Sequence, residues 1–177
     1  MELNEKKTKN IIFNFTNWYQ VSTRLSVNDK NIQTFDSVKL LETIVANNLK
    51  WEENTASLVK RAHSRMQLLR KVAGFSSNIK DLLTIYKIFI RSVLEQTCSV
   101  WHSSLTVDLS TDLERVQKCA LRIILGKYYK SYKEACSKVG IEDLATRRAS
   151  LCLSFAKKCL TNPKMKHIFP ENQQNYN

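Results

Sequence analysis

Residues 82–126 have the sequence LLTIYKIFIRSVLEQTCSVWHSSLTVDLSTDLERVQKCALRIILG, in which a Trp-His-Ser-Ser joint at 101–104 separates two amphipathic segments. Apolar side chains recur at steps of three and four in both segments, so each segment predicts a helix with one buried side. The first helix is expected to bury Ile79, Leu82, Leu83, Tyr86, Phe89, Ile90, Val93, Leu94, Thr97 and Trp101. The second is expected to bury Leu109, Leu113, Val116, Ala120 and Ile124. It should end at Gly126, because glycine favours a left-handed cap.

The helical pattern extends on both sides of this stretch, from Asn54 to Leu160. One further helical face is expected to close at Gly74, and it consists of Leu58, Ala62, Met66, Leu69 and Ala73. Later boundaries are expected at Ser77, at a Ser131–Glu134 capping box, at Gly140, and at Asn162-Pro163 after a last helix over 141–160. The acid pairs Glu52-Glu53 and Glu142-Asp143 precede apolar-periodic segments, so they predict helix N-termini rather than metal ligands.

The residues before Lys50 have a strand-like pattern instead. Strands are expected at 9–15, 21–27, 32–35 and 39–45, with a hairpin-type turn at 28–31. The sequence therefore predicts an α+β fold, in which a small antiparallel sheet is followed by a mainly α-helical bundle. The expected organisation is strands in 1–52, a helical domain in 53–162 and a polar tail in 163–177.

The amino-acid composition and the net charge limit the classes of protein to which the chain can belong. The 177 residues are 43% hydrophobic with only three glycines and two prolines, which favours one core built from helices. The net charge of +12 favours a polyanion or an acidic partner.

No apolar stretch approaches the ~20 residues that cross a bilayer, and the N-terminus is polar, so we expect no membrane association and an intracellular location, nuclear or cytoplasmic. Five widely spaced cysteines indicate reduced thiols rather than disulfides.

Basic and aromatic residues alternate in the sequence KYYKSYK at 127–133. Such a segment suits phosphate contact combined with stacking on bases. The alternative is that Tyr129 and Tyr132 pack inward and the lysines form a solvated rim. A stripe of Arg115, Lys118 and Arg122 leads along the predicted helix into this segment, which adds weight to nucleic-acid binding.

No other group of residues in the sequence predicts catalysis or metal binding. The sequence His102-Ser103-Ser104 lacks the Gly-x-Ser-x-Gly turn of a hydrolase nucleophile. Cys152, Cys159 and His167 lack the two-residue ligand spacing of structural zinc, so they predict no metal site and no cofactor. Arg148 falls on the apolar side of its helix, which predicts a buried cation that seeks a carboxylate.

Several short motifs in this order resemble the region just past the polymerase active site in reverse transcriptases of LINE-type (non-LTR) retrotransposons. They are VWHSSL at 100–105, LERVQK at 113–118, LRIILG at 121–126, Arg147-Arg148 and FAKKCL at 155–160. Towards the N-terminus, Leu3-Asn4, KTK at 7–9 and IIF at 11–13 resemble the last palm strand of these enzymes. Lys39-Leu40-Leu41 resembles their primer grip, and Leu49-Lys50-Trp51 resembles their link into the thumb.

The resemblance covers the chain from Leu3 to about Pro170 and implies a palm remnant followed by a thumb-like domain. Its implied role is non-specific binding of an RNA–DNA or DNA duplex, with Lys39, Leu40 and Leu41 as a primer-grip-like segment. The residues expected to contact nucleic acid are Lys7, Lys9, Arg115, Lys118, Arg122, Lys127, Lys130 and Lys133. The resembled enzymes usually have glycine after the leucine pair, where this chain has Glu42, and that departure counts against the primer-grip role.

The aromatic-Ala-Asp-Asp turn that holds the catalytic metals in the resembled enzymes does not occur in this sequence. We therefore expect a fragment without polymerase activity, for which the missing palm portion is a candidate partner. Two alternatives stay open, a helical protein-interaction module and an inert translated remnant of a truncated element.

Overall fold

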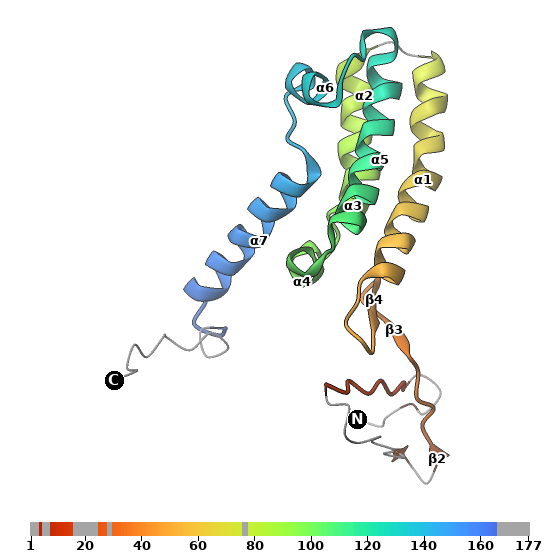
Figure 1. Cartoon of the computed structure of the whole chain (residues 1–177), viewed down its shortest axis with the longest axis vertical. Helices are drawn as coiled ribbons and strands as arrows, with labels where there is room; N and C mark the ends of the chain where they lie inside the picture. Colours follow the sequence, from red (N-terminus) through yellow and green to blue (C-terminus); the bar gives the residue numbers. More distant parts are fainter. Residues whose placement is uncertain (1–3, 5–7, 16–24, 28–29, 76–77, 166–177) are drawn as a thin grey trace.

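The computed structural model describes residue 4 and residues 8–15, 25–27, 30–75 and 78–165, and there the chain forms a helical bundle with short strands at one end (Figure 1). The strands are β1 (Ser26–Val27), β2 (Lys30–Asn31), β3 (Ser37–Leu40) and β4 (Thr43–Ala46). The helices are α1 (Glu52–Phe75), α2 (Ile79–Ile85), η2 (Tyr86–Arg91), α3 (Ser92–Leu94), α4 (Cys98–Trp101), η3 (His102–Ser104), α5 (Val107–Leu125), η4 (Gly126–Tyr128), α6 (Tyr132–Val139) and α7 (Leu144–Thr161). The expected α+β class is confirmed.

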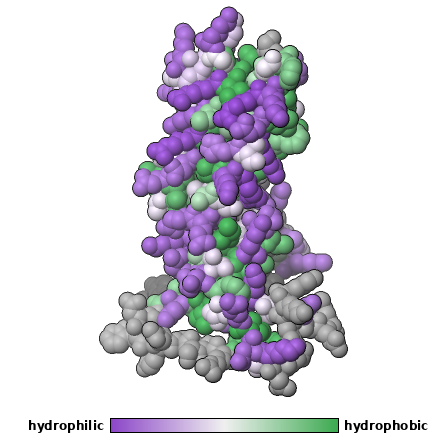
Figure 2. Space-filling view, turned by 90° about the vertical axis from the view of Figure 1, so that its right-hand side faces the viewer, coloured by the Kyte–Doolittle hydropathy of each residue, from purple (hydrophilic) through white to green (hydrophobic). Residues whose placement is uncertain are grey.

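Three long helical segments form the body of the bundle. The chain runs along α1, returns through α2, η2 and α3, and runs back along α5 (Figure 1). The predicted inner faces of α1 and α5 meet in the core, where Leu58, Met66, Leu113 and Ala120 are fully or almost fully buried. The outward face of α1 is largely hydrophilic, with small apolar areas between the polar side chains (Figure 2). Apolar periodicity therefore located these two helices correctly.

The segment 79–101 is not the single helix that its periodicity predicted. Its middle part, η2, is a π-helix, and its wider turn shifts the helical phase so that Phe89 is 45% exposed instead of buried. The helix is interrupted before α4, where Thr97 has a left-handed backbone with φ +50° and an exposed side chain. Trp101 keeps its predicted place in the core, because its indole N–H donates to the Gln96 carbonyl at 3.0 Å.

Most of the predicted N-terminal strands are wrong in position. In 9–15 only Asn10 pairs, through an isolated parallel bridge to Thr34, and a strand needs partners along its whole length. Residues 32–35 form no strand apart from that bridge, whereas β2 lies in the predicted turn and pairs antiparallel with β1. In the predicted strand 21–27, Ser26 and Val27 form β1, Leu25 is not in a strand, and 21–24 lie outside the described residues.

The predicted single strand 39–45 is a hairpin instead. Strands β3 and β4 pair antiparallel with Leu40 opposite Thr43, so Leu41 and Glu42 form the two-residue turn. Both turn residues have positive φ, +46° and +68°, as a mirror-image hairpin turn requires. Contacts with the bundle hold the hairpin in place: Ile44 N–H donates to Asn54 Oδ1 at 3.1 Å, and the hydroxyls of Thr43 and Thr97 are 2.6 Å apart.

Glycine in place of Glu42 should stabilise the protein, because glycine adopts this left-handed conformation without strain. The carboxylate forms ion pairs with Lys39 (2.8 Å) and Arg61 (3.4 Å), but such exposed pairs contribute little. We expect Glu42→Gly to raise the melting temperature by roughly 2–4 °C in a thermal unfolding experiment. Glu42→Ala is the matched control, since it removes the same ion pairs and keeps the strain. A rise of equal size in Glu42→Ala would refute the conformational explanation.

The helix ends largely follow the predicted capping residues. The side chain of Ser131 accepts from the Glu134 N–H at the start of α6, and Gly140 ends α6 with φ +65°. Asp143 caps α7, with an oxygen 2.8 Å from the Thr146 N–H, so α7 begins at Leu144 rather than at 141. Two boundaries differ: Gly74 lies inside α1, which ends at Phe75, and the N-cap of α2 is Asn78. Ser77, the predicted cap, lies outside the described residues.

Arg148 is fully buried, as its helical position predicted. Its guanidinium carbon is 5.8 Å from the Trp101 ring centroid, and its nitrogens donate to His102 Nδ1 (3.4 Å) and Ser110 Oγ (3.3 Å). The predicted carboxylate partner is not found: among the described residues no acid pairs directly with Arg148, and Nη1 has no hydrogen-bond partner. Burial lowers the pKa of Arg148, while nearby acidic groups, first Glu114, oppose that shift through space.

The burial of His102, together with its contact with Arg148, should make stability depend on the titration of this histidine. Burial and then the Arg148 cation lower the pKa of His102 below its ordinary 6.5, so the unfolded chain binds this proton more readily than the folded chain. The contribution of neutral His102 to the free energy of unfolding should be fully present above about pH 6.5. It should be lost as the pH decreases towards the lowered pKa. Urea unfolding at several pH values measures this.

The variant His102→Asn cannot titrate, although its amide oxygen can still accept from Arg148, so its stability should fall less steeply with decreasing pH. The matched control is His63→Asn, at an exposed position on α1. An unchanged pH dependence in His102→Asn, or equal flattening in both variants, would contradict the assignment.

Candidate nucleic-acid interface

The basic residues gather around the junction of α5, η4 and α6. Between Arg115 and Gly140 the sequence has seven lysines and arginines and one acid, Glu134. Six of the cations surround three tyrosines, and we call this surface the Lys–Tyr face. It consists of Lys118, Arg122, Lys127, Tyr128, Tyr129, Lys130, Tyr132, Lys133 and Lys138.

Two sharp turns bring these side chains together. Gly126 has φ +50° and ends α5, after which the 3-10 turn η4 leads the chain across the end of the bundle. Ser131 then starts α6, which packs against the side of α5 near that end (Figure 1). Cations that are well separated along the sequence therefore lie on one side of the molecule.

The three tyrosines of the KYYKSYK segment differ in exposure, so neither interpretation of the segment holds for all of them. Tyr129 and Tyr132 are partly buried and pack against the core, as the structural alternative predicted. Tyr128 is 56% exposed, so its ring is available to a ligand.

Cations lie over all three tyrosine rings. Lys118 Nζ is 5.1 Å from the ring centroid of Tyr132, and the guanidinium of Arg122 is 5.3 Å from that of Tyr129. Two lysines, Lys127 and Lys138, lie 5.4 and 4.7 Å from the centroid of Tyr128. Such contacts orient the cations and leave their charges at the surface, where an anion can meet them.

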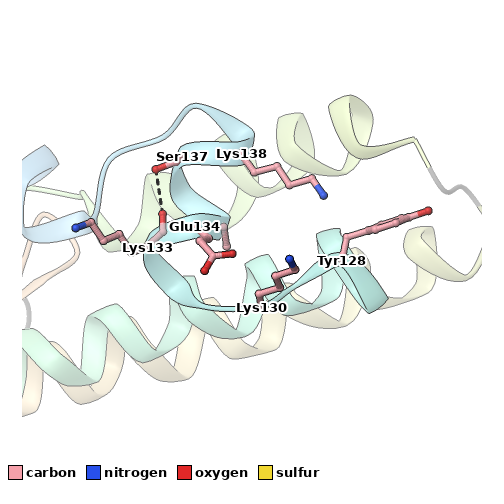
Figure 3. A pocket seen from close by; sticks show the side chains of 7 residues that line it. Tyr128, Lys130, Lys133, Glu134, Ser137 and Lys138 are labelled. Carbon is pink, nitrogen blue, oxygen red and sulfur yellow. Dashed lines mark hydrogen bonds between the residues drawn. The ribbon is translucent and has the colours of Figure 1, made fainter.

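A hollow of about 470 Å³ lies in this face, and it is lined by Tyr128, Lys130, Lys133, Glu134, Ala135, Ser137 and Lys138 (Figure 3). The Ser137 hydroxyl donates to the Lys133 carbonyl at 3.1 Å, so it is already engaged within α6. Glu134 is the single acid in the lining, against three lysines. The hollow therefore favours an anion over a cation.

A buried polar network supports this face from beneath. Gln117 is fully buried and accepts a hydrogen bond from the Tyr86 hydroxyl, while its amide nitrogen donates to Tyr132 Oη (2.8 Å) and to the Glu142 carbonyl (2.9 Å). The Tyr132 hydroxyl donates in turn to Glu114. Burial is the largest cause of the raised pKa of both tyrosines, so they stay neutral donors.

The carboxylate of Glu114 ties this network to α7. Its second oxygen accepts from the Ala145 N–H at 2.7 Å, within the first turn of α7. Glu114 therefore faces the interior, and its negative charge does not repel an anion bound at the surface. The network fixes α6 and the start of α7 against α5.

The structure brings together five of the cations predicted from sequence: Lys118, Arg122, Lys127, Lys130 and Lys133. Lys138 belongs to the same face and was missed, although its position one turn after Glu134 on the outer side of α6 could have indicated it. Arg115 is exposed and pairs with Asp112, and it lines a different hollow between α1 and α5.

The other predicted contacts lie elsewhere. Lys9 is 5.0 Å from the Phe35 ring centroid in the N-terminal segment, at the opposite end of the bundle from α6 (Figure 1). Lys39 pairs with Glu42, and Leu40 and Leu41 are 63% and 83% exposed around the hairpin turn at that same end. Lys7 lies outside the described residues. The primer-grip-like segment and the Lys–Tyr face are therefore separate surfaces.

In the described part of the chain, no group of three or more His, Cys, Asp or Glu side chains could hold a metal ion. His167, one of the residues weighed as a zinc ligand, lies outside that part. None of the described helices has the length and apolar character needed to cross a membrane. Compared with protein-family models, with curated proteins and with solved structures, the chain gave no match.

Proposed function

We propose that the chain binds nucleic acid without sequence preference, through contacts of the Lys–Tyr face with the phosphate backbone. The observation that carries this proposal is the concentration of charge between Lys118 and Lys138, where the six cations of the Lys–Tyr face and one acid, Glu134, give a net charge of +5 (six minus one) out of the chain's +12. Lysine and arginine next to exposed aromatic rings are the usual residues of phosphate contact and base stacking.

The motifs that resemble those of LINE-type reverse transcriptases favour a particular setting for this activity. In that setting the bundle is the thumb-like part of a polymerase and holds an RNA–DNA or DNA duplex by position and charge. The metal-binding carboxylates are supplied by a palm portion that this sequence does not contain, so the chain has no polymerase activity of its own. The exposed segment of Lys39, Leu40 and Leu41, at the opposite end of the bundle, is the candidate primer contact that the resemblance implies.

Neutralising three lysines of the face should weaken binding to all duplex sequences alike. We expect Lys130→Gln/Lys133→Gln/Lys138→Gln to lower affinity for a short RNA–DNA duplex roughly 30-fold at low salt, measured by fluorescence anisotropy. The slope of log K against log salt should become shallower by about 2–3, because up to three phosphate contacts are lost.

The matched control is Lys157→Gln/Lys158→Gln/Lys164→Gln. It removes the same charge from exposed positions in the last turns of α7 and just after its end, away from α6 (Figure 1). If both triple variants lose affinity equally, binding reflects net charge alone. If neither loses affinity, the Lys–Tyr face is only a solvated surface.

A further inference from the structure

Tyr128 lies between two hollows of different character. On one side is the basic hollow lined by Lys130, Lys133 and Lys138. On the other is an apolar hollow of about 220 Å³, bounded by the ends of α1 and α5 and the start of α2. The side chains and backbone that line it are those of Ala73, Ile79, Leu82, Ile123, Ile124, Leu125, Gly126, Lys127 and Tyr128. Tyr128 is the tyrosine that lines both.

We propose that Tyr128 is the stacking platform for one unpaired base of a nucleic-acid strand, with the phosphates beside that base held in the basic hollow. This proposal rests on the proposed function and names the part of the nucleic acid that the same face recognises. The argument is chemical complementarity, since a nucleotide combines a flat apolar ring system with an adjacent anion. The apolar hollow, at about 220 Å³, is smaller than the pockets that hold drug-sized ligands. It therefore suits one base beside the Tyr128 ring rather than several stacked bases.

The lysines over the Tyr128 ring do not prevent stacking. Lys127 and Lys138 are both exposed, so each can turn from the ring towards a phosphate as a base takes its place. The stacked base and the new lysine–phosphate contacts together outweigh the two exposed cation–π contacts that are lost, so the exchange is favourable.

A base inside a duplex is already stacked and paired, so it cannot reach Tyr128. Tyr129 and Tyr132 offer no second platform, because both rings are partly buried against the core. The protein should therefore bind a duplex with a single-stranded extension more tightly than the same duplex with blunt ends. It should also lose that preference when the extension has no bases.

The test measures binding by fluorescence anisotropy for three forms of one duplex: blunt, with a single-stranded extension, and with an extension made of abasic nucleotides. The parent chain should prefer the natural extension roughly tenfold over the other two. Tyr128→Ala should remove this preference, while Tyr128→Phe should keep it, because phenylalanine retains the ring. Glu134→Gln should tighten binding to all three forms by a few-fold, since it removes the one acid from the basic hollow.

The results separate this proposal from the proposed function. Equal binding of natural and abasic extensions, or a full preference in Tyr128→Ala, overturns the stacking site even if the lysine triple variant still loses affinity. Loss of the preference in Tyr128→Ala, with the preference kept in Tyr128→Phe, supports it. Absence of any lysine effect overturns the proposed function itself.

Discussion

Replacing Arg148 with glutamate should lower the free energy of unfolding by about 3–5 kcal/mol, as expected when a buried charge is left without its compensation. The new carboxylate would be fully buried and would lie among the acidic groups, Glu114, Asp143 and Glu95, that now act favourably on the guanidinium. It would also lose the aromatic face of Trp101 as a cation–π partner. Urea unfolding of the purified variant measures the change.

Replacing Arg148 with methionine is the informative comparison. The guanidinium forms no direct ion pair with a described residue and leaves one nitrogen unsatisfied, so removing the charge also removes a desolvation cost. We expect Arg148→Met to stay within about 1 kcal/mol of the parent chain or to be slightly more stable. Small and equal effects of both substitutions would mean that water reaches the inner side of α7 in solution.

Replacing Gln117 with leucine should cost about 2–5 kcal/mol, although leucine is the more apolar residue. The Tyr86 hydroxyl would be left buried without its acceptor, and the Glu142 carbonyl would lose its donor. Each buried group left unsatisfied costs about 1–3 kcal/mol, which outweighs the apolar surface that leucine adds. Guanidinium unfolding at a fixed pH gives this value.

A double-mutant cycle with Tyr86→Phe identifies the cause. In the Gln117→Leu background, Tyr86→Phe removes the orphaned hydroxyl and should recover about 1 kcal/mol or more. In the parent background the same change should destabilise, because it leaves the Gln117 amide oxygen without its donor. Strict additivity of the two substitutions would show that the two side chains are not coupled.

The candidate site was predictable in part. Lys118, Arg122, Lys127, Lys130 and Lys133 were found from the sequence, because charge clusters and helical spacing depend on neighbouring residues. The inclusion of Lys138 required the observed packing of α6 against the side of α5. The separation of Lys9 and Lys39 from this face also required the structure, since sequence order says nothing about which end of a helix a distant segment joins.

Gln117 shows why the supporting network could not be predicted. Its helical position, next to Val116 and one turn before Leu121, places it on the buried side of α5. Its polar side chain gives no sign of burial, because the partners that satisfy it, Tyr86 and Tyr132, lie 31 and 15 residues away. A buried amide becomes acceptable only when such partners are in place.

The sequence by itself determined the helices α1 and α5 with their inner faces, the caps at Ser131 and Gly140, and the burial of Arg148. These features follow from side chains within one or two turns of each other, so local periodicity and capping chemistry are sufficient. Tertiary structure alone decided the hairpin turn at Leu41 and Glu42, which has no turn-forming residue. It also decided the break at Thr97, in a segment whose periodicity continues. Both places have strained positive φ values that local preference opposes. They are held by distant contacts, Ile44 with Asn54, Thr43 with Thr97 and Arg61 with Gln96, and only the folded chain brings these partners together.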